Sequence, residues 1–293
     1  MRIAVAGSHG LIGSALVESL GRAGHHVVRL VRRPATATDE VRWDPEGFGV
    51  PPGAFDGLDA VVALGGVGLG TRRWSGWFKQ QLRDSRVGPT TVLAEAVAAA
   101  GVPVFLGASA TGFYGDTGDH AVTEEDPGGT GFLADLTADW EAATAPAAGA
   151  RVVHLRTAPV LSRRGGLLGT LRPLYRLGIG GPIGDGRQFF SWIALDDEVA
   201  AIGHVLESDS ISGPVNLAAP QPVRYGDFSE QLARRLHRRS LLRVPARVAK
   251  AAGGELVEEL VLTSSRVEPK VLQNRGFAFA RPTLPEALEY TRA

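Results

Sequence analysis

The sequence predicts an α/β protein with a doubly wound parallel β-sheet and a smaller C-terminal lobe rich in helices. Short apolar runs alternate with longer stretches of helical periodicity through the first half of the chain. These apolar runs are almost continuous, as expected for strands that are buried on both faces. The first run passes directly into a glycine-rich turn and then into a helical pattern, which is typical of the start of a β-α-β unit.

The elements follow one another in a regular order. Strands are predicted where short apolar runs end in small residues, and helices where apolar residues recur every three or four positions. The predicted strands are residues 2–7, 25–32, 58–66, 102–109, 150–157 and 213–220, and the predicted helices are residues 11–24, 75–100, 132–148 and 224–238.

The pattern loosens after Ser162, where glycine and arginine become frequent. We therefore expect a nucleotide-binding domain over residues 1–243, with substrate-lobe elements within about 162–243, and a small C-terminal domain over residues 244–293.

Composition excludes several classes of protein. The 293 residues include 31 Lys+Arg and 31 Asp+Glu, so we expect no field of one sign that attracts nucleic acid or a membrane. The chain has no cysteine, and it has no apolar run long enough for a signal segment or a membrane span. The seven histidines show no spacing typical of metal ligands, so no metal is predicted. These features are typical of a cytoplasmic protein.

The first glycine-rich turn predicts a dinucleotide site. Gly7 permits a tight turn, Gly10 lets the backbone approach a pyrophosphate, and Gly13 allows close packing of helix and strand. The helix that follows offers free N–H groups to the phosphates. The spacing is G-x-x-G-x-x-G, and a plain glycine-rich turn is the alternative. The expected contacts are Gly7, Ser8, His9, Gly10, Leu11, Ile12 and Gly13.

The end of the second predicted strand favours NADP over NAD. An NAD site usually has an acidic residue there to accept from the adenosine ribose, whereas this chain has Arg32 and Arg33. Guanidinium groups bind a 2′-phosphate through paired hydrogen bonds, although solvated surface arginines are the alternative. Arg32 is the first candidate. Leu64, Gly65 and Gly66 end the next strand and are expected to pass close to the adenine side of the pyrophosphate, with a plain turn as the alternative.

The stretches "AGSHGLIG", "LGASATGFYG" and "SWIALDD" resemble the extended branch of the short-chain dehydrogenase/reductase superfamily. The resemblance is closer to an atypical subgroup, the epimerase family proteins, whose matching stretches include "RRWSGWFKQQLRDSRVGPTTVLAEAV" and "RLGIGGPIGDGRQFFSWIALDDEV". This resemblance implies a Rossmann-type fold, NADP, an unknown substrate and a short C-terminal domain of unknown function. Where relatives usually have histidine after Trp-Ile, this chain has Ala194.

The resemblance also makes one absence informative. The superfamily typically uses a Tyr-x-x-x-Lys pair, in which lysine lowers the tyrosine pKa. Here Tyr114 is followed at the fourth position by Gly118, and no lysine occurs between Lys79 and Lys250. The helix in which the pair normally begins has Phe132 or Leu133 near the tyrosine position. The usual proton relay is therefore predicted to be absent.

Other candidate residues have a structural alternative beside the functional one. Ser109 and Tyr114 are the candidate catalytic residues, and a turn cap or a buried hydroxyl is the alternative. The resemblance implies that Gln81, Arg86 and Val160 contact the cofactor, and a helix surface or core packing explains them equally well. Asp196 and Asp197 are expected to cap a helix that begins near Glu198.

Two functions remain open at this stage. One is an NADP-dependent oxidoreductase or epimerase that acts on a small-molecule substrate, with nucleotide-linked compounds among the candidates. The other is a non-catalytic NADPH-binding sensor, because a fold does not fix a function. A homodimer through the segment 75–100 is a further expectation from the resemblance.

Overall fold

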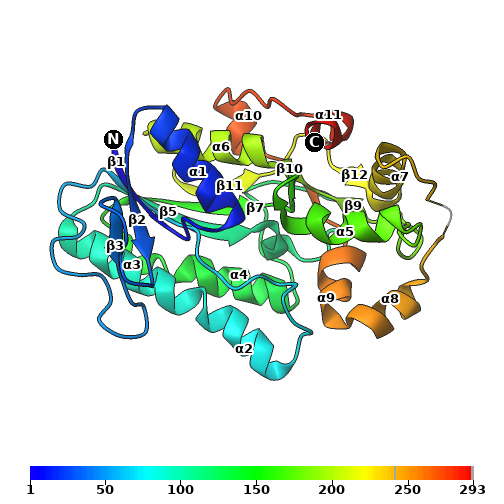
Figure 1. Ribbon diagram of the computed structural model, residues 1–293, viewed down its shortest axis with the longest axis horizontal. Coiled ribbons are helices and arrows are strands. Elements are labelled where there is room, and N and C mark those ends of the chain that lie inside the picture. Colours follow the sequence, from blue (N-terminus) through cyan, green and yellow to red (C-terminus); the bar gives the residue numbers. More distant parts are fainter. Residues whose placement is uncertain (241, 292–293) are drawn as a thin grey trace.

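The computed structural model describes residues 1–240 and 242–291, and its centre is a parallel β-sheet of seven strands (Figure 1). The strands lie in the order β11-β7-β5-β4-β1-β2-β3. Their bounds are β1 Arg2–Ala6, β2 His26–Val31, β3 Glu40–Arg42, β4 Ala60–Ala63, β5 Val104–Ala110, β7 Arg151–Thr157 and β11 Gly213–Leu217. All six pairings within this sheet are parallel, so every strand ends at the same edge.

Helices cover both faces of this sheet, which confirms the doubly wound prediction. Helices α1 (Leu11–Arg22) and α6 (Leu195–Glu207) pack on one face, and α3 (Val87–Ala100) and α4 (Phe132–Ala142) lie on the other (Figure 1). Separate apolar cores form on the two faces, because successive strand residues point to opposite sides. Burial of the sheet on both sides explains why its strands are almost entirely apolar.

The predicted helix over residues 75–100 is two helices in the structure. Helix α2 (Gly76–Asp84) ends before Ser85, and α3 begins after Arg86. The Ser85 hydroxyl accepts from the Val67 N–H at 3.2 Å, and the Arg86 guanidinium donates to the Val67 carbonyl at 3.0 Å. The break therefore lets two side chains hold the loop that follows β4.

A second lobe lies at the right of Figure 1, beyond the carboxyl ends of the central strands. Its own core joins aromatic and apolar side chains of α5, α7 and α11. Its helices are α5 Gly166–Arg176, α7 Tyr225–Arg235, α8 Ala246–Gly253, α9 Glu255–Val257, the π-helix η3 Glu258–Leu262 and α11 Leu284–Tyr290, whereas α10 Lys270–Asn274 packs beside β11 of the central sheet. Its short strands are β8 Val160–Ser162, β9 Phe189–Phe190, β10 Ile193–Ala194, β12 Val223–Arg224 and β13 Arg266–Val267. The remaining elements are β6 Ala121–Val122, which pairs with β13, and the 3-10 turns η1 Thr111–Tyr114 and η2 Ala145–Ala147.

Residues 244–291 pack onto the rest of the chain rather than forming a core of their own. Leu272 of α10 enters the main core beside α6, whereas Leu284 and Leu288 of α11 enter the core of the second lobe. Among the helices of the described residues, none combines the length and the hydropathy that crossing a bilayer requires.

The expectation that Asp196 and Asp197 cap helix α6 is wrong. The helix begins at Leu195, and no side chain caps it. Asp197 instead accepts hydrogen bonds from the backbone N–H groups of Ala280 and Arg281, at 2.7 and 2.9 Å. This buried carboxylate therefore ties the C-terminal segment to α6.

Candidate functional site

Two cavities lie along the edge of the sheet at which the parallel strands end. The first, of about 470 Å³, follows strands β1, β2 and β4. Its lining residues are Gly7, Ser8, His9, Gly10, Leu30, Val31, Arg32, Arg33, Trp43, Gly65, Gly66, Val67 and Ser85. In open α/β sheets, ligands bind in crevices at this edge.

The glycines of the first turn are required by close backbone packing. Gly7 has a φ of +79°, and a Cβ atom there would lie 2.8 Å from the Leu64 backbone. A Cβ atom at Gly13 would lie 2.1 Å from the Gly7 carbonyl oxygen. Leu64 therefore supports the turn from behind and does not line the cavity.

The turn presents hydrogen-bond donors that the protein leaves available. Gly10 is the N-cap of α1 and provides no side-chain cap. The backbone N–H groups of Leu11, Ile12 and Gly13 have no acceptor among the described residues, whereas the Ser14 N–H donates to the Gly10 carbonyl at 2.9 Å. Free N–H groups at the positive end of a helix fit the phosphates of a dinucleotide.

The two arginines after β2 have different environments. The Arg33 guanidinium donates to both carboxylate oxygens of Glu40, at 2.8 and 2.7 Å, and also approaches the His9 Nε2 atom at 3.4 Å. Arg32 makes no ion pair among the described residues, and its guanidinium lies 6.0 Å from the centre of the Trp43 ring. Arg32 is therefore the guanidinium that remains available for a ligand.

Sequence reasoning did not find Glu40, a carboxylate that β3 brings beside the end of β2. The side chain is 1% exposed and is bound by Arg33, Arg29 and the Thr36 N–H. The Arg33 guanidinium, with the Thr36 N–H, holds the pKa of this carboxyl well below its usual range. Glu40 therefore remains ionised, and its bonds to the protein occupy the oxygens that a ribose hydroxyl would need.

The predicted contacts on α2 and α3 divide between surface and interior. Gln81 lines a further hollow of about 300 Å³ that it shares with Arg32. Arg86 is buried, and its guanidinium donates to the carbonyls of Leu82 and Val67 at 3.0 Å each. Burial lowers the pKa of Arg86 to about 10. The structure thus uses Arg86 to position the loop that carries Gly66.

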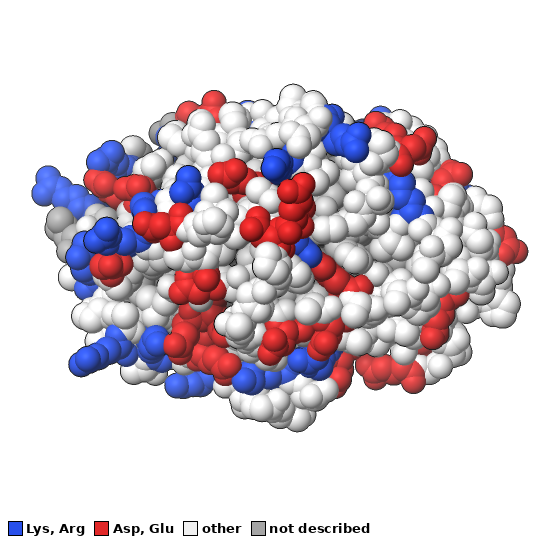
Figure 2. All heavy atoms as spheres, turned by 180° about the vertical axis from the view of Figure 1, so that it is seen from behind, with Lys and Arg blue, Asp and Glu red and all other residues white. Residues whose placement is uncertain are grey.

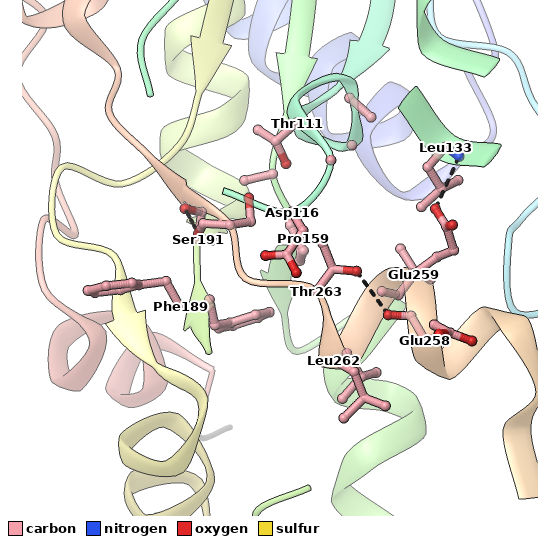
Figure 3. A pocket seen from close by; sticks show the side chains of 18 of the residues that line it. Thr111, Asp116, Leu133, Pro159, Phe189, Ser191, Glu258, Glu259, Leu262 and Thr263 are labelled. Carbon is pink, nitrogen blue, oxygen red and sulfur yellow. Dashed lines mark hydrogen bonds between the residues drawn. The ribbon is translucent and has the colours of Figure 1, made fainter. Parts of the chain in front are cut away.

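The second cavity, of about 550 Å³, follows strands β5 and β7 (Figure 3). Residues from the carboxyl ends of these strands, from the start of α4 and from the C-terminal segment enclose it. Its lining includes Ala110, Thr111, Asp116, Leu133, Thr137, Thr157, Ala158, Pro159, Phe189, Ser191, Lys250 and the segment 258–263. Val160 is not part of this lining but packs against the main core.

Ser109 and Tyr114 lie beside this cavity without lining it. The Ser109 hydroxyl donates to Glu141 at 2.6 Å. The Tyr114 hydroxyl donates to Asn216 at 2.7 Å and accepts from Arg156 at 2.9 Å. Burial raises the pKa of Tyr114, although Arg156 opposes this rise. Both hydroxyls therefore have partners within the protein.

Thr111 is the residue at this position that sequence reasoning missed. It begins η1, directly after β5, and its side chain lies on the wall of the cavity (Figure 3). The Thr111 hydroxyl has no hydrogen-bond partner in the described part of the chain. It lies two residues after Ser109 in the same Ser-Ala-Thr run, so the sequence contained the candidate.

Helix α4 presents two side chains, one turn apart, to the same cavity. Leu133 and Thr137 both line it, and the Thr137 hydroxyl donates to the Leu133 carbonyl at 2.6 Å. These residues have the four-residue separation of a Tyr-x-x-x-Lys pair. This face of α4 therefore carries a leucine and a threonine whose hydroxyl is bound to the backbone of the same helix.

A buried carboxyl group stands behind the cavity wall. Thr157, at the end of β7, donates its hydroxyl to Glu198 at 2.9 Å. Glu198 is fully buried, and its second oxygen has no partner in the described part of the protein. Burial raises the pKa of Glu198 to about 8.

The C-terminal segment closes one side of the cavity. The Glu259 carboxylate accepts from the Leu133 N–H at 3.2 Å, at the start of α4. Lys79 of α2 donates to Glu255 at 2.9 and 3.1 Å, so α2 also binds this segment. Within the described residues, no group of three or more His, Asp or Glu side chains is arranged as a metal site.

Parallel strands, a glycine turn with free donors and two cavities at one sheet edge define a dinucleotide-binding protein of the Rossmann type. The chain belongs to the NAD dependent epimerase/dehydratase family, whose model matches residues 3–218. Residues 244–291 match a domain of unknown function, DUF1731.

Relatives match along nearly the whole chain. Epimerase family protein MT2273 of Mycobacterium tuberculosis is 49% identical over 290 residues, which cover 98% of this chain and 96% of the relative. The human epimerase family protein SDR39U1 is 33% identical and covers 99% of each chain. A crystal structure of human SDR39U1 with NADPH has a TM-score of 0.91 at 31% identity, and it covers 100% of this chain and 99% of that one.

Proposed function

We propose that this protein binds NADP(H) along the carboxyl edge of the sheet and catalyses a redox or epimerisation reaction on a small molecule. The adenosine end lies in the 470 Å³ cavity, and the nicotinamide lies beside Ala158 and Pro159 in the 550 Å³ cavity. The observation that carries this proposal is the row of N–H groups without acceptors at Leu11, Ile12 and Gly13.

The preference for NADP over NAD rests on charge. Glu40, the carboxylate that β3 brings beside the end of β2, is occupied by arginine and threonine donors, whereas Arg32 has no ion pair among the described residues. A guanidinium with free donors suits a 2′-phosphate. The NADPH in the structure of human SDR39U1 supports the same choice.

The bound cofactor would supply hydride transfer at the nicotinamide, and the protein must orient the substrate and provide a proton. A Tyr-x-x-x-Lys pair is absent from the sequence, and the side chains that α4 contributes to the cavity include Leu133 and Thr137. We assign the hydrogen bond to the reacting substrate oxygen to the Thr111 hydroxyl, because this hydroxyl lines the cavity and has no partner among the described residues. Threonine has too weak an acidity to release its proton alone, so solvent completes the transfer.

Two experiments separate this enzyme from a cofactor sensor. Titration of NADPH fluorescence first measures binding. The NADPH-bound protein is then incubated with carbonyl compounds and with nucleotide sugars, while absorbance and product mass are followed. Substrate-dependent loss of NADPH, or an epimerised product, is the expected result. Tight binding without turnover across the panel would favour the sensor, and absence of binding would refute the proposal.

A further inference from the structure

The balanced total charge of the chain conceals a strong separation of charge. Residues 172–184 and 231–254 together carry nine of the 31 Lys and Arg residues and none of the 31 Asp and Glu residues. The rest of the chain therefore has an excess of carboxylates. A surface built from these two stretches has a positive potential that the net charge does not reveal.

The fold places the two stretches side by side. Arg238 donates through its Nε atom to the Arg176 carbonyl at 2.9 Å. Val244 exchanges backbone hydrogen bonds of 2.9 Å with Pro182 and Gly184. These contacts join the end of α5 to the segment between α7 and α8, at the right of Figure 1. We call this surface, formed by residues 172–184, 231–240 and 242–250, the basic end.

The basic end also exposes large apolar side chains. Among the described residues, five of the nine exposed large hydrophobic side chains belong to it. They are Leu174 at 41% exposure, Leu177 at 75%, Ile179 at 52%, Leu242 at 52% and Val248 at 56%. A concentration of apolar side chains on a small part of the surface is typical of an interaction site.

Most arginines of the basic end have no carboxylate partner. Arg234, Arg235 and Lys250 form ion pairs with Glu230, Glu289 and Glu258. The other exposed arginines form none within the described residues, and they are Arg176, Arg238, Arg239, Arg243 and Arg247. Figure 2 shows Lys and Arg side chains at its left, the end that lies at the right of Figure 1, with Asp and Glu side chains among them.

We propose that the basic end binds the surface of a bilayer that contains anionic phospholipids. Arginines beside exposed aliphatic side chains suit the headgroup region and the acyl region of a bilayer surface. The guanidinium groups would contact lipid phosphates, and the leucines would enter the boundary of the acyl chains. Neither interaction requires a helix that crosses the bilayer. This proposal is independent of the reaction in the 550 Å³ cavity.

Two other occupants fit the basic end less well. A second copy bound through the same surface would bring the unpaired arginines of both copies together, and like charges repel. Nucleic acid would use the arginines, but Leu177 and Ile179 offer no ring for stacking on bases. The lipid surface is the occupant that uses both kinds of side chain.

The test is co-sedimentation of the full chain with vesicles. One set contains phosphatidylcholine alone, and the other an equimolar mixture of phosphatidylcholine and phosphatidylglycerol. We expect binding to the anionic vesicles, weakening as salt is added. Arg239→Gln and Arg243→Gln should each weaken vesicle binding about fivefold, because each basic residue near an anionic surface contributes about 1 kcal/mol of binding free energy. Leu177→Ser should also weaken binding, and its exposure makes it compatible with folding.

A matched control lies at the opposite end of the molecule. The Arg42 guanidinium lies 5.4 Å from the ring centre of Phe48, and Phe48 is 54% exposed. The double variant Arg42→Gln, Phe48→Ser should bind anionic vesicles as the wild type does. The proposal is overturned if the wild type does not bind them, or if the control loses as much binding as the variants of the basic end.

Two further measurements identify a different occupant. Analytical ultracentrifugation reports self-association, and titration with a DNA duplex reports nucleic-acid binding. A dimer that Leu177→Ser abolishes would assign the basic end to a second copy and overturn the lipid proposal. Duplex binding without vesicle binding would overturn it in favour of nucleic acid.

Discussion

The substitution Gly13→Ala tests whether the glycine turn binds the cofactor through its backbone. The added Cβ atom would lie 2.1 Å from the Gly7 carbonyl oxygen and 3.0 Å from the Ser8 Cα atom. Because ordinary contacts of this kind are about 3.5 Å, the turn and α1 must separate by roughly 1.4 Å. Both neighbours are backbone atoms, so no flexible side chain can absorb the movement.

The expected effect on binding follows from hydrogen-bond geometry. A displacement of this size lengthens an N–H···O bond of about 2.9 Å beyond the range of a hydrogen bond. Bonds to charged groups contribute about 1.5–3 kcal/mol each. Loss of two such bonds between the turn and the pyrophosphate costs at least about 3 kcal/mol, which weakens NADPH binding by more than about a hundredfold.

Helix α1 provides a matched control in Gly21→Ala. No heavy atom lies within 4 Å of the added Cβ, and the position is exposed. This variant should bind NADPH as the wild type does and gain up to about 1 kcal/mol of stability from helix propensity. NADPH fluorescence titration measures both variants, with circular dichroism to verify folding. If folded Gly13→Ala binds NADPH as tightly as Gly21→Ala, the reasoning about the turn is wrong.

Three further predictions concern single side chains. Arg32→Ala should weaken NADPH binding about 10- to 100-fold and leave NADH binding unchanged, and equal losses for both would contradict the assignment of the 2′-phosphate. Glu198 has its pKa raised from 4.5 to about 8 in the folded state. Its contribution to stability is therefore complete below pH 4.5 and falls as the pH rises to about 8, by up to about 1 kcal/mol per pH unit. Urea unfolding across this range should show that slope in the wild type, whereas Glu198→Gln should lack its contribution. Tyr114→Phe should lower the free energy of unfolding by about 1–3 kcal/mol, because Arg156 and Asn216 each lose a partner. Its NADPH affinity should not change, and a large loss of that affinity would show that Tyr114 contacts the cofactor.

The sequence was sufficient to predict the glycine turn and six of the seven strands of the sheet, because these depend on local patterns, whereas the three-residue strand β3 was not predicted. Continuous apolar strands indicate that the sheet is buried on both faces, and the spacing of Gly7, Gly10 and Gly13 indicates close backbone contact in the turn. The break at Ser85 and Arg86 could not be predicted in the same way. The break depends on a hydrogen bond between Ser85 and Val67, which lies eighteen residues before Ser85 in the chain.

In the candidate site, too, local patterns predict some features, and others depend on contacts between distant parts of the chain. Arg32 and Arg33 are adjacent in sequence, and only the fold separates them, because β3 brings Glu40 to Arg33. Periodicity does not reveal which hydroxyl of the Ser-Ala-Thr run faces the cavity, since the strand ends within it. The net charge of the whole chain does not reveal the basic end, although the acid-free stretches 172–184 and 231–254 are visible in the sequence.

A structure of the protein crystallised with NADPH tests the central claim most directly. The account predicts the pyrophosphate on the N–H groups of Leu11–Gly13, the 2′-phosphate at Arg32, and the nicotinamide between Thr111 and Pro159. A cofactor bound away from the glycine turn, or a nicotinamide outside the 550 Å³ cavity, would contradict it.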